Sequence, residues 1–359
     1  MNSKLENPVA SKPTQSKTET KADPNYNKFA ASWYIVMQSK ALSKEPKAIE
    51  LFGQSLVAWR DQNNQPVIME RFCPHMGGDL AIGEVVEGSI QCPFHHWSFN
   101  SFGECTSIPN VDYIPDKACQ ITYITAEKYG YVWLWYGSKT PLFSLPESSS
   151  LEDYSHNYMP FRSQSSVKST VRRVGESPYD YSHIVTVHDQ KISAPIKLTL
   201  TNYESEKQNQ LVIPPEAGFG ALVEFPNDNS YMGRLDTLAK ILGLHAESFT
   251  LKVDSWPGGA IITAFIDGVE KFKVLNAPTP VAQEQVIVHV LLMVKKTGNF
   301  LLDILYYLLF VWQNNVAITE DNQIFNSMKL DGGGVYIKDD LGVLKFREFY
   351  KLWVSKVEQ

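Results

Sequence analysis

Two short stretches of sequence decide the fold of the first part of the chain: residues 73–78 (CPHMGG) and residues 92–97 (CPFHHW). Each offers one thiolate and one imidazole, in the order C-x-H and, sixteen residues later, C-x-x-H. Zinc sites usually pair like with like along the chain, with two cysteines first and two histidines later. The interleaved order favours a [2Fe–2S] cluster in which the cysteines bind one iron and the histidines the other. The predicted cluster ligands are Cys73, His75, Cys92 and His95.

The residues around these ligands support a cluster. A proline follows each cysteine and Gly77-Gly78 lie in the first motif, which allows backbone amides to turn toward the sulfides; Trp97 is placed to shield the cluster. The competing interpretation is a zinc ribbon or a pair of ordinary core cysteines. Cys105 and Cys119 have no comparable neighbours and are predicted to be small buried apolar residues. His96 lies beside a ligand but outside the pattern, which indicates a supporting or surface role.

The composition is that of an acidic globular protein. The chain has 359 residues, is 43% hydrophobic and carries a net charge of −6, and at about 150 residues per domain its length predicts two domains. Without a block of Lys and Arg it is not expected to bind nucleic acid. Four cysteines and a start without an apolar run predict a reducing, cytoplasmic location. The most apolar stretch, residues 300–312, is too short to cross a bilayer and contains Asp303. It predicts a buried helix and no transmembrane segment, with peripheral membrane contact as the alternative.

The texture of the sequence changes twice along the chain. Residues 1–25 are polar and predicted to be a disordered tail, and residues 26–140 show short β-type runs separated by turns, typical of an all-β module. A segment rich in Pro and Ser then leads into residues 141–359, where strands and helices mix as in an α+β domain. Its expected strands cover residues 197–201, 249–253, 260–265 and 285–295, and its expected helices cover 178–188 and 299–329. A final segment is predicted to dock on the rest of the chain through Phe346, Phe349, Tyr350 and Trp353.

Residues 176–188 (ESPYDYSHIVTVH) hold a second group of candidate metal ligands. A Ser-Pro pair is typical of a helix start, with Ser177 as N-cap, and Asp180 and His183 then share one helix face. His188 lies five residues beyond His183, about 140° further round a regular helix, so the helix must bend or end before both reach one metal. Two imidazoles and one carboxylate are typical of non-haem iron(II) oxygenases, which keep other coordination positions open for dioxygen and substrate.

A third ligand is available on the later expected helix, within residues 317–325 (AITEDNQIF). Glu320 and Asp321 are both candidates if this helix packs beside the first. The competing interpretation is that they are solvated charges on a helix surface.

Taken together, the two cluster hairpins, the pattern E-x-x-x-D-x-x-H-x-x-x-x-H and a distant acid resemble the oxygenase subunits of Rieske non-haem iron oxygenases, from about residue 28 to the end. The resemblance implies an N-terminal all-β Rieske domain followed by a helix-grip catalytic domain, an antiparallel sheet with helices, assembled as a homotrimer. It implies that His183, His188 and Asp321 bind the mononuclear iron. It also implies that Asp180 bridges the two centres, passing electrons from His95 of one subunit to His183 of its neighbour.

Several segments resemble one branch of that family, the arylamine N-oxygenases of the aminopyrrolnitrin oxygenase type. They are AASWYIVMQSKAL (30–42), ELFGQSLVAWR (50–60), IQCPFHHWSF (90–99), AEKYGYVWLWYGS (126–138), LDGGGVYIK (330–338) and VLKFREFYKLWV (343–354). This resemblance implies oxidation of an aromatic amine through hydroxylamine and nitroso stages to a nitro group, in secondary metabolism. Ser177, where the branch has Asn, and the variable stretch 208–236 keep C-hydroxylation, demethylation and desaturation open, because the pocket decides which substrate atom is oxidised.

Partners and pocket residues follow from the same comparison of patterns. No G-x-G-x-x-G turn follows a strand, so NAD(P)H is expected to act only through a separate reductase, with or without a ferredoxin, that docks near His95 and His96. His245 is expected at the surface.

Rivals outside the oxygenases are a ferredoxin-like electron carrier, which would bind two irons per chain instead of three, and a zinc-stabilised interaction module. Pocket candidates, for which a plain core role is equally expected, are Phe219, Phe225, Phe249, Phe265, Phe272 and His289.

Overall fold

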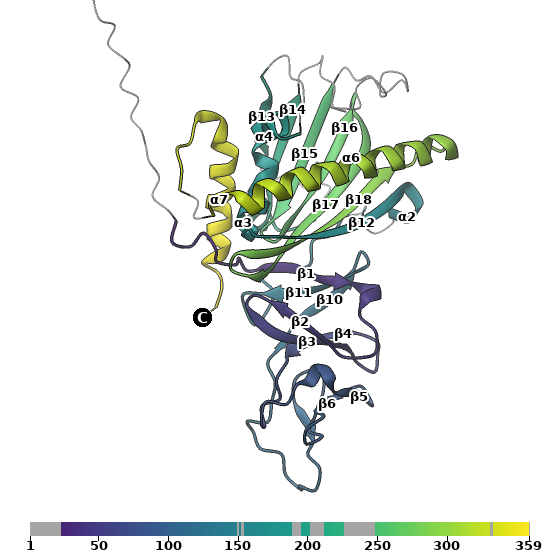
Figure 1. Cartoon of the computed structure of the whole chain (residues 1–359), viewed down its shortest axis with the longest axis vertical. Helices are drawn as coiled ribbons and strands as arrows, with labels where there is room; N and C mark the ends of the chain where they lie inside the picture. Colours follow the sequence, from purple (N-terminus) through teal and green to yellow (C-terminus); the bar gives the residue numbers. More distant parts are fainter. Residues whose placement is uncertain are drawn as a thin grey trace, which may run out of the picture.

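The computed structural model describes residues 23–148, 151, 154–188, 195–201, 212–225, 248–330 and 333–358. Two parts lie end to end along the longest axis, a β-rich part below and a sheet covered by helices above (Figure 1). This is the α+β architecture that the sequence predicts, with an all-β module first. The predicted tail, residues 1–25, lies outside the described residues except for its last three. Of those, Asp23 forms an ion pair with the buried Arg172, so the predicted tail extends too far.

The first part consists of three small antiparallel sheets. Their strand orders are β1-β11-β10, β2-β3-β4-β9 and β5-β6-β7-β8. The third sheet forms the free tip of the molecule (Figure 1). The loops that carry the two cluster motifs follow β4 and β6, so both motifs lie at this end. The strands are β1 (Ser32–Gln38), β2 (Lys47–Leu51), β3 (Gln54–Arg60), β4 (Pro66–Glu70), β5 (Glu84–Val86), β6 (Ser89–Gln91), β7 (Ser98–Phe99), β8 (Cys105–Ser107), β9 (Thr122–Tyr123), β10 (Thr125–Lys128) and β11 (Tyr131–Tyr136).

The second part is built on a seven-stranded antiparallel sheet of order β12-β18-β17-β16-β15-β14-β13. Strands β13 to β18 pair in chain order, as hairpins do, and β12 closes the sheet beside β18. All four expected strands are confirmed, two of them with the predicted ends. The strands are β12 (Tyr158–Val167), β13 (Lys197–Thr201), β14 (Phe219–Phe225), β15 (Phe249–Trp256), β16 (Gly259–Ile266), β17 (Val269–Ala282) and β18 (Gln285–Lys295).

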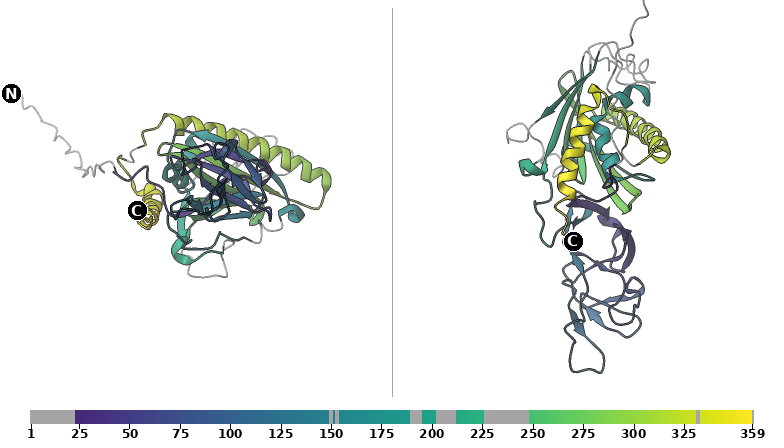
Figure 2. Two further views of the ribbon diagram at one scale, coloured as in Figure 1. Left: turned by 90° about the horizontal axis from the view of Figure 1, so that it is seen from below. Right: turned by 90° about the vertical axis from the view of Figure 1, so that its left-hand side faces the viewer.

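Helices lie on one face and one edge of this sheet (Figure 2). The longest, α6, crosses the face in front of β12 and β18. It starts after Asn299, whose side-chain oxygen accepts hydrogen bonds from the N–H groups of Leu301 and Leu302 at 3.1 and 3.3 Å. The α-helices are α2 (Tyr154–Asn157), α3 (Val171–Glu176), α4 (Tyr181–Thr186), α6 (Phe300–Ser327) and α7 (Leu341–Val354), with a 3-10 turn, η3 (Ser177–Tyr179), between α3 and α4.

The prediction that residues 300–312 form a buried helix is wrong about burial. Phe300 and Leu301 are each 75% exposed and Trp312 is 46% exposed. Only a narrow stripe faces the sheet, where the Phe310 ring contacts Phe272 at 4.9 Å. By length and composition alone α6 could cross a membrane, and 17% of its most apolar 18-residue segment is buried. Core helices pass the same test, so this is weak evidence for membrane insertion.

The two parts share one hydrophobic core at their junction. Trp33 and Trp135 of the first part cluster with Trp256 of the sheet and Trp353 of α7. The indole N–H of Trp256 donates to the carbonyl of Trp33 at 3.4 Å, and the rings of Trp33 and Trp135 lie 5.7 Å apart. The predicted docking of the C-terminal segment is confirmed, because Trp353 is buried in this core. A domain boundary at residue 140 stays a prediction.

Candidate metal centres

The two cluster loops have nearly the same backbone. The Cys73 N–H donates to the Gly78 carbonyl at 2.8 Å and the Gly77 N–H donates back to the Cys73 carbonyl at 2.9 Å. The second loop repeats both bonds, from Cys92 to Trp97 at 2.8 Å and from His96 to Cys92 at 2.9 Å. Gly77 and His96 hold equivalent positions, with φ of +73° and +58°. His96, which the sequence left as a supporting or surface residue, is exposed and makes the turn.

The side chains of these loops fit the ligand set of a Rieske cluster. Cys73 and Cys92 are buried, whereas His75 and His95 are exposed with ring centroids 4.6 Å apart. His75 also stacks on Trp97 at 4.4 Å. Burial, together with the neighbouring Cys92, raises the pKa of the Cys73 thiol. Thiols held inside and imidazoles held at the surface match a cluster with an inner and an outer iron.

Close packing leaves no space for a side chain at Gly78. A Cβ there would lie 2.7 Å from the Cys92 sulfur. Arg71 and Asp79 flank the first loop and pair through two hydrogen bonds of 2.9 and 2.5 Å. These two residues were missed by the sequence analysis, although an Arg and an Asp at either end of a ligand loop are a visible signal. Cys105 is buried as predicted, but the prediction for Cys119 is wrong because it is exposed in a loop.

The second donor set lies between α4 and α6. His183, His188 and Asp321 each bring one ligand atom into a group whose members lie within 4.8 Å of one another. Two imidazole nitrogens and one carboxylate oxygen fit iron(II) with open positions. α4 ends at Thr186, so His188 lies in the following turn and turns back toward His183, as the five-residue spacing requires.

The predicted start of this helix is wrong. Ser177 is not an N-cap but the first residue of the 3-10 turn η3, and α4 begins after Asp180, whose carboxylate accepts from the His183 N–H at 3.4 Å. The cause is Tyr179, which is fully buried and donates its hydroxyl to the carbonyl of Phe219 at 2.9 Å. Because this hydrogen bond fixes the position of Tyr179, the 3-10 turn ends there and a regular helix begins only after Asp180.

Hydrogen bonds orient both histidine rings. The Nδ1–H of His183 donates to the backbone carbonyl of Asp180, and the Nδ1–H of His188 donates to Glu320 at 3.0 Å. Nε2 of His188 lies 3.3 Å from Asp321. Burial disfavours a charged His188, but the bonds to Asp321 and Glu320 outweigh it and raise the pKa of His188. Glu320 is therefore not a solvated charge, since it faces the ring that the sequence analysis had paired with Asp321.

Asp180, His183 and Asp321 line a cavity of about 180 Å³. The side chain of Asp180 is 43% exposed. In one chain α4, which carries His183, lies in the upper part of the molecule, whereas β5 and β6, beside the second cluster loop, lie at the lower tip (Figure 1).

The predicted pocket residues are divided among several places. Phe219 packs in the core against Phe346 and Phe349, and Phe225 packs against Phe249. His289 is buried on the other side of the sheet, beside Tyr131 of the first part, where burial lowers its pKa to about 4. The variable stretch 208–236 lies outside the described residues except for 212–225, and His245 also lies outside them.

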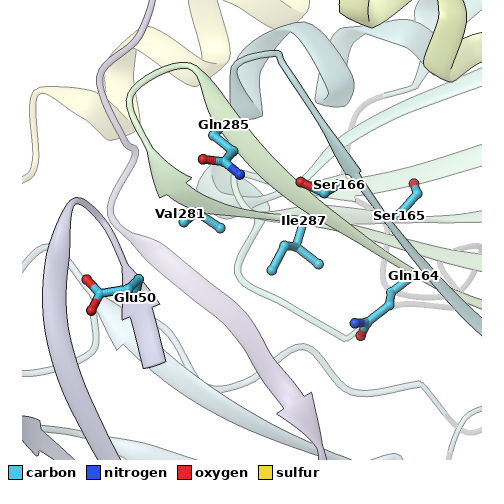
Figure 3. Close-up of a pocket in the computed structure, with 7 residues that line it drawn as sticks. All are labelled: Glu50, Gln164, Ser165, Ser166, Val281, Gln285 and Ile287. Carbon is cyan, nitrogen blue, oxygen red and sulfur yellow. The ribbon is translucent and has the colours of Figure 1, made fainter. Parts of the chain in front are cut away.

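A second cavity, of about 340 Å³, lies between β2 of the first part and strands β12, β17 and β18 of the second part (Figure 3). It contains no Cys or His and holds a single charged side chain, which gives it no metal-binding set. Its lining residues are Glu50, Gln164, Ser165, Ser166, Val281, Gln285 and Ile287.

Known proteins resemble both parts of the chain. The Rieske [2Fe-2S] domain family matches residues 32–118. The chain is similar to aminopyrrolnitrin oxygenase PrnD of Pseudomonas fluorescens, with 39% identity over 92% of this chain and 93% of that protein. It is 32% identical, over 45% of this chain and 44% of the relative, to the oxygenase component of 3-ketosteroid-9-alpha-monooxygenase of Rhodococcus rhodochrous.

Two solved structures have the same fold. Dicamba monooxygenase bound to dicamba matches with a TM-score of 0.72 and 15% identity, over 91% of this chain and 98% of that chain. NdmA of Pseudomonas putida CBB5 with caffeine matches with a TM-score of 0.69 and 19% identity, over 93% and 96%.

The fold and the two donor sets define an oxygenase with an electron-receiving iron–sulfur module and a second iron in an α+β part. The chain belongs to the Rieske non-haem iron oxygenases. Its cofactors are a [2Fe–2S] cluster and a mononuclear iron. As an oxygenase component it works with a substrate, dioxygen and separate electron-transfer partners.

Proposed function

We propose that this oxygenase converts an aromatic amine to the corresponding nitro compound. The observation that carries the proposal is the 39% identity to aminopyrrolnitrin oxygenase PrnD, spread over 92% of this chain and 93% of the relative. Identity of this breadth includes the sheet and helices that surround the iron site as well as the cluster loops.

The overall reaction takes place in three stages, from amine to hydroxylamine, to nitroso and to nitro, and adds two oxygen atoms net to the nitrogen. At each stage one atom of dioxygen goes to the substrate nitrogen, and the other is reduced to water by two electrons and two protons. In the second stage the N,N-dihydroxy product then loses one water, so the nitroso compound keeps a single oxygen. The iron supplies the dioxygen-activating chemistry when it is bound. The protein positions the amine nitrogen and delivers the electrons.

One face of the sheet supports recognition of a polar substrate group. Along β17, Phe272, Val274 and Asn276 point to the α6 side, since Phe272 contacts Phe310 of α6 and side chains alternate along a strand. Asn276 is half-buried, yet its side-chain oxygen is buried without a hydrogen-bond partner among the described residues. A buried amide oxygen needs a donor, and an arylamine N–H is a suitable one.

The electron path is part of the proposal. Asp180 of one subunit receives electrons from the His95 side of a neighbouring subunit's cluster and passes them to His183. The exposed Asp180 carboxylate, the exposed ligand histidines and the separation of the two donor sets within one chain support this path. It requires a closed assembly such as a homotrimer, with the reductase docking beside His95 and His96 in a cytoplasmic, reducing setting.

The decisive experiment is a substrate screen. The anaerobically reduced protein, with both iron centres loaded, is mixed with dioxygen, a surrogate reductase and a panel of aromatic amines, and products are identified by mass. Matched substrates in which the amino group is replaced by methyl or methoxy serve as controls. Hydroxylamine, nitroso or nitro products from the amines are expected. Ring hydroxylation, demethylation or desaturation without any N-oxygenation would overturn the proposal while leaving the oxygenase class intact.

A further inference from the structure

A buried ion pair links the C-terminal helix to the turn that carries Asp180. Glu176 is the last residue of α3 and precedes Asp180 by four residues. Arg347 of α7 holds both carboxylate oxygens of Glu176, from Nε at 2.6 Å and from Nη2 at 2.8 Å. Arg173 binds the same carboxylate at 2.5 Å from within α3. The Arg347–Glu176 pair is thus a planar, two-pronged contact between elements 171 residues apart in sequence.

Arg347 is itself held firmly in place. Its Nη1 donates to the Tyr336 hydroxyl, and its guanidinium lies 4.9 Å from the centre of the Tyr336 ring. Burial disfavours the charged guanidinium, but the bonds to Glu176 and Tyr336 outweigh it and raise the pKa of Arg347. The side chain therefore stays charged and in one orientation.

The same helix holds the other end of the turn. The Tyr179 ring stacks on Phe346 with centroids 5.2 Å apart. One helical turn earlier, a Cβ at Gly342 would lie 3.0 Å from the Tyr179 carbonyl, so α7 approaches the turn more closely than a larger residue allows. Glu176, just before η3, and Tyr179, the last residue of η3, thus both contact α7.

Apart from this support, the contacts of Asp180 among the described residues are with its own turn and with His183, whose Nδ1–H donates to the Asp180 carbonyl. The Asp180 N–H donates to the Ser177 carbonyl at 3.0 Å, within the same turn. Its carboxylate makes the long 3.4 Å contact to the His183 N–H and lies 3.9 Å from Nδ1 of the same residue, and its side chain is 43% exposed. The direction in which the carboxylate points is therefore set by the backbone between Glu176 and Asp180.

The far end of α7 is attached to the first part of the chain. The Trp353 carbonyl accepts from the Ala31 N–H at 3.0 Å, and the Tyr350 hydroxyl donates to the Lys28 carbonyl at 3.1 Å. Beyond the helix, the Glu358 N–H donates to the Gly137 carbonyl at 2.6 Å. In Figure 2 (right) α7 runs from beside α4 down to the junction of the two parts. α7 therefore contacts the cluster-bearing module at one end and the turn before Asp180 at the other.

We infer that Arg347 is a positioning residue that, through Glu176, holds Asp180 in the orientation needed to pass electrons to the iron site. This inference rests on the proposed bridging role of Asp180. It gives α7 a function in electron transfer in addition to its contribution to the core.

The test compares Arg347→Gln with Arg173→Gln in the full-length protein. Both changes remove one guanidinium from the same carboxylate, but only the first cuts the link to α7. Reoxidation of the reduced cluster is followed by its visible absorbance with iron, substrate and dioxygen present. In Arg347→Gln we expect the rate to fall roughly 10- to 100-fold, the loss usual for supporting residues of metal sites, with the cluster content unchanged. Arg173→Gln should stay within a few-fold of wild type.

Two further measurements separate positioning from general stability. Hydrogen exchange of the amides between Ser177 and His183 should accelerate in Arg347→Gln and not in Arg173→Gln. Adding Arg347→Gln to Asp180→Asn should slow cluster reoxidation no further, whereas a purely structural effect would add to it. Arg347→Lys, which keeps the charge without the two-pronged contact, should lie between wild type and Arg347→Gln.

The outcomes distinguish this inference from the proposed bridge. A wild-type rate of cluster reoxidation in Asp180→Asn would overturn the proposed bridging role of Asp180. Slow reoxidation in Asp180→Asn combined with a normal rate in both Arg347 variants, or an additive double variant, would overturn the positioning role alone.

Discussion

His188 lies between two acids that have different roles. Asp321 lies 3.3 Å from Nε2, whereas Glu320 accepts a hydrogen bond from Nδ1–H at 3.0 Å. A hydrogen bond to the second nitrogen fixes the tautomer and orientation of a metal-binding imidazole. Two adjacent acids in one helix thus approach one histidine from two sides.

Replacing Glu320 by Gln is expected to weaken iron binding about 10-fold without emptying the site, because Gln still offers an oxygen to Nδ1–H but no charge. Asp321→Ala is expected to deplete the mononuclear iron entirely. Iron content after dialysis against a chelator measures both, and the cluster absorbance is the internal control. If Glu320→Ala empties the site while Asp321→Ala keeps its iron, the ligand is Glu320.

Gly78→Ala is expected to lower the cluster content sharply, because its Cβ would lie 2.7 Å from the Cys92 sulfur and 3.2 Å from the Phe94 Cβ. Gly77→Asn is the matched control. Gly77 has a φ of +73° and open space around its Cβ position, and Asn accepts this conformation better than other residues with side chains. Iron and acid-labile sulfide analysis of the two variants measures the difference, and equal cluster contents would contradict the steric argument.

Among the helices and strands, α4 is the one whose end could be predicted from the sequence and whose start could not. The spacing of His183 and His188 required the helix to bend or end, and it ends at Thr186. The start could not be predicted from the Ser-Pro signature, because the position of the helix is decided by Tyr179, whose hydroxyl bonds to Phe219, 40 residues away. Local signals placed the strands well, since β13 (KLTLT) and β18 (QVIVHVLLMVK) are runs rich in apolar and β-branched residues.

The N-terminus of α6 offers an independent test. Asn299→Ala removes the acceptor for the N–H groups of Leu301 and Leu302, which is expected to cost about 1 kcal/mol in the free energy of unfolding. Asn315→Ala, at an exposed position in the same helix, is expected to be neutral or slightly stabilising because Ala has the higher helix propensity. Urea denaturation compares the two. Equal unfolding free energies would show that the cap contributes nothing to stability.

In the whole molecule, the two donor sets lie in different parts: β6 precedes the second cluster loop at the lower tip, and α4 carries His183 in the upper part (Figure 1). The ligand loops could be predicted from sequence because their donors lie within a few residues of each other. The link from Arg347 to Glu176 could not, because no local pattern relates an Arg on the last helix to a Glu 171 positions earlier. The exposure of the apolar first half of α6 could not be predicted either, because hydropathy does not reveal which side of a helix packs against the rest of the protein.

Subunit complementation tests the path between chains. Cys92→Ser removes a cluster ligand and His183→Ala removes an iron ligand, so each variant alone is expected to be inactive. Co-expressed in one assembly, an intact cluster in one subunit can serve an intact iron site in the next, and random mixing should restore roughly a quarter of wild-type activity in a symmetric oligomer. A mixture of two chains that both carry His183→Ala is the control. Persistent inactivity of the mixed assembly, with metal contents as designed, would show that electrons stay within one chain.

The shared core also determines when this protein finishes folding during synthesis. Trp33 near the beginning and Trp353 near the end of the described chain belong to the same buried cluster. Domains usually fold in order as they leave the ribosome, but here the core of the first module stays incomplete until α7 has emerged. A nascent chain that stops before Trp353 would leave the Phe143 ring, which contacts both Trp135 and Trp353, without one of its two partners. Termination within α7 would therefore damage the module made first as well as the part that contains α7.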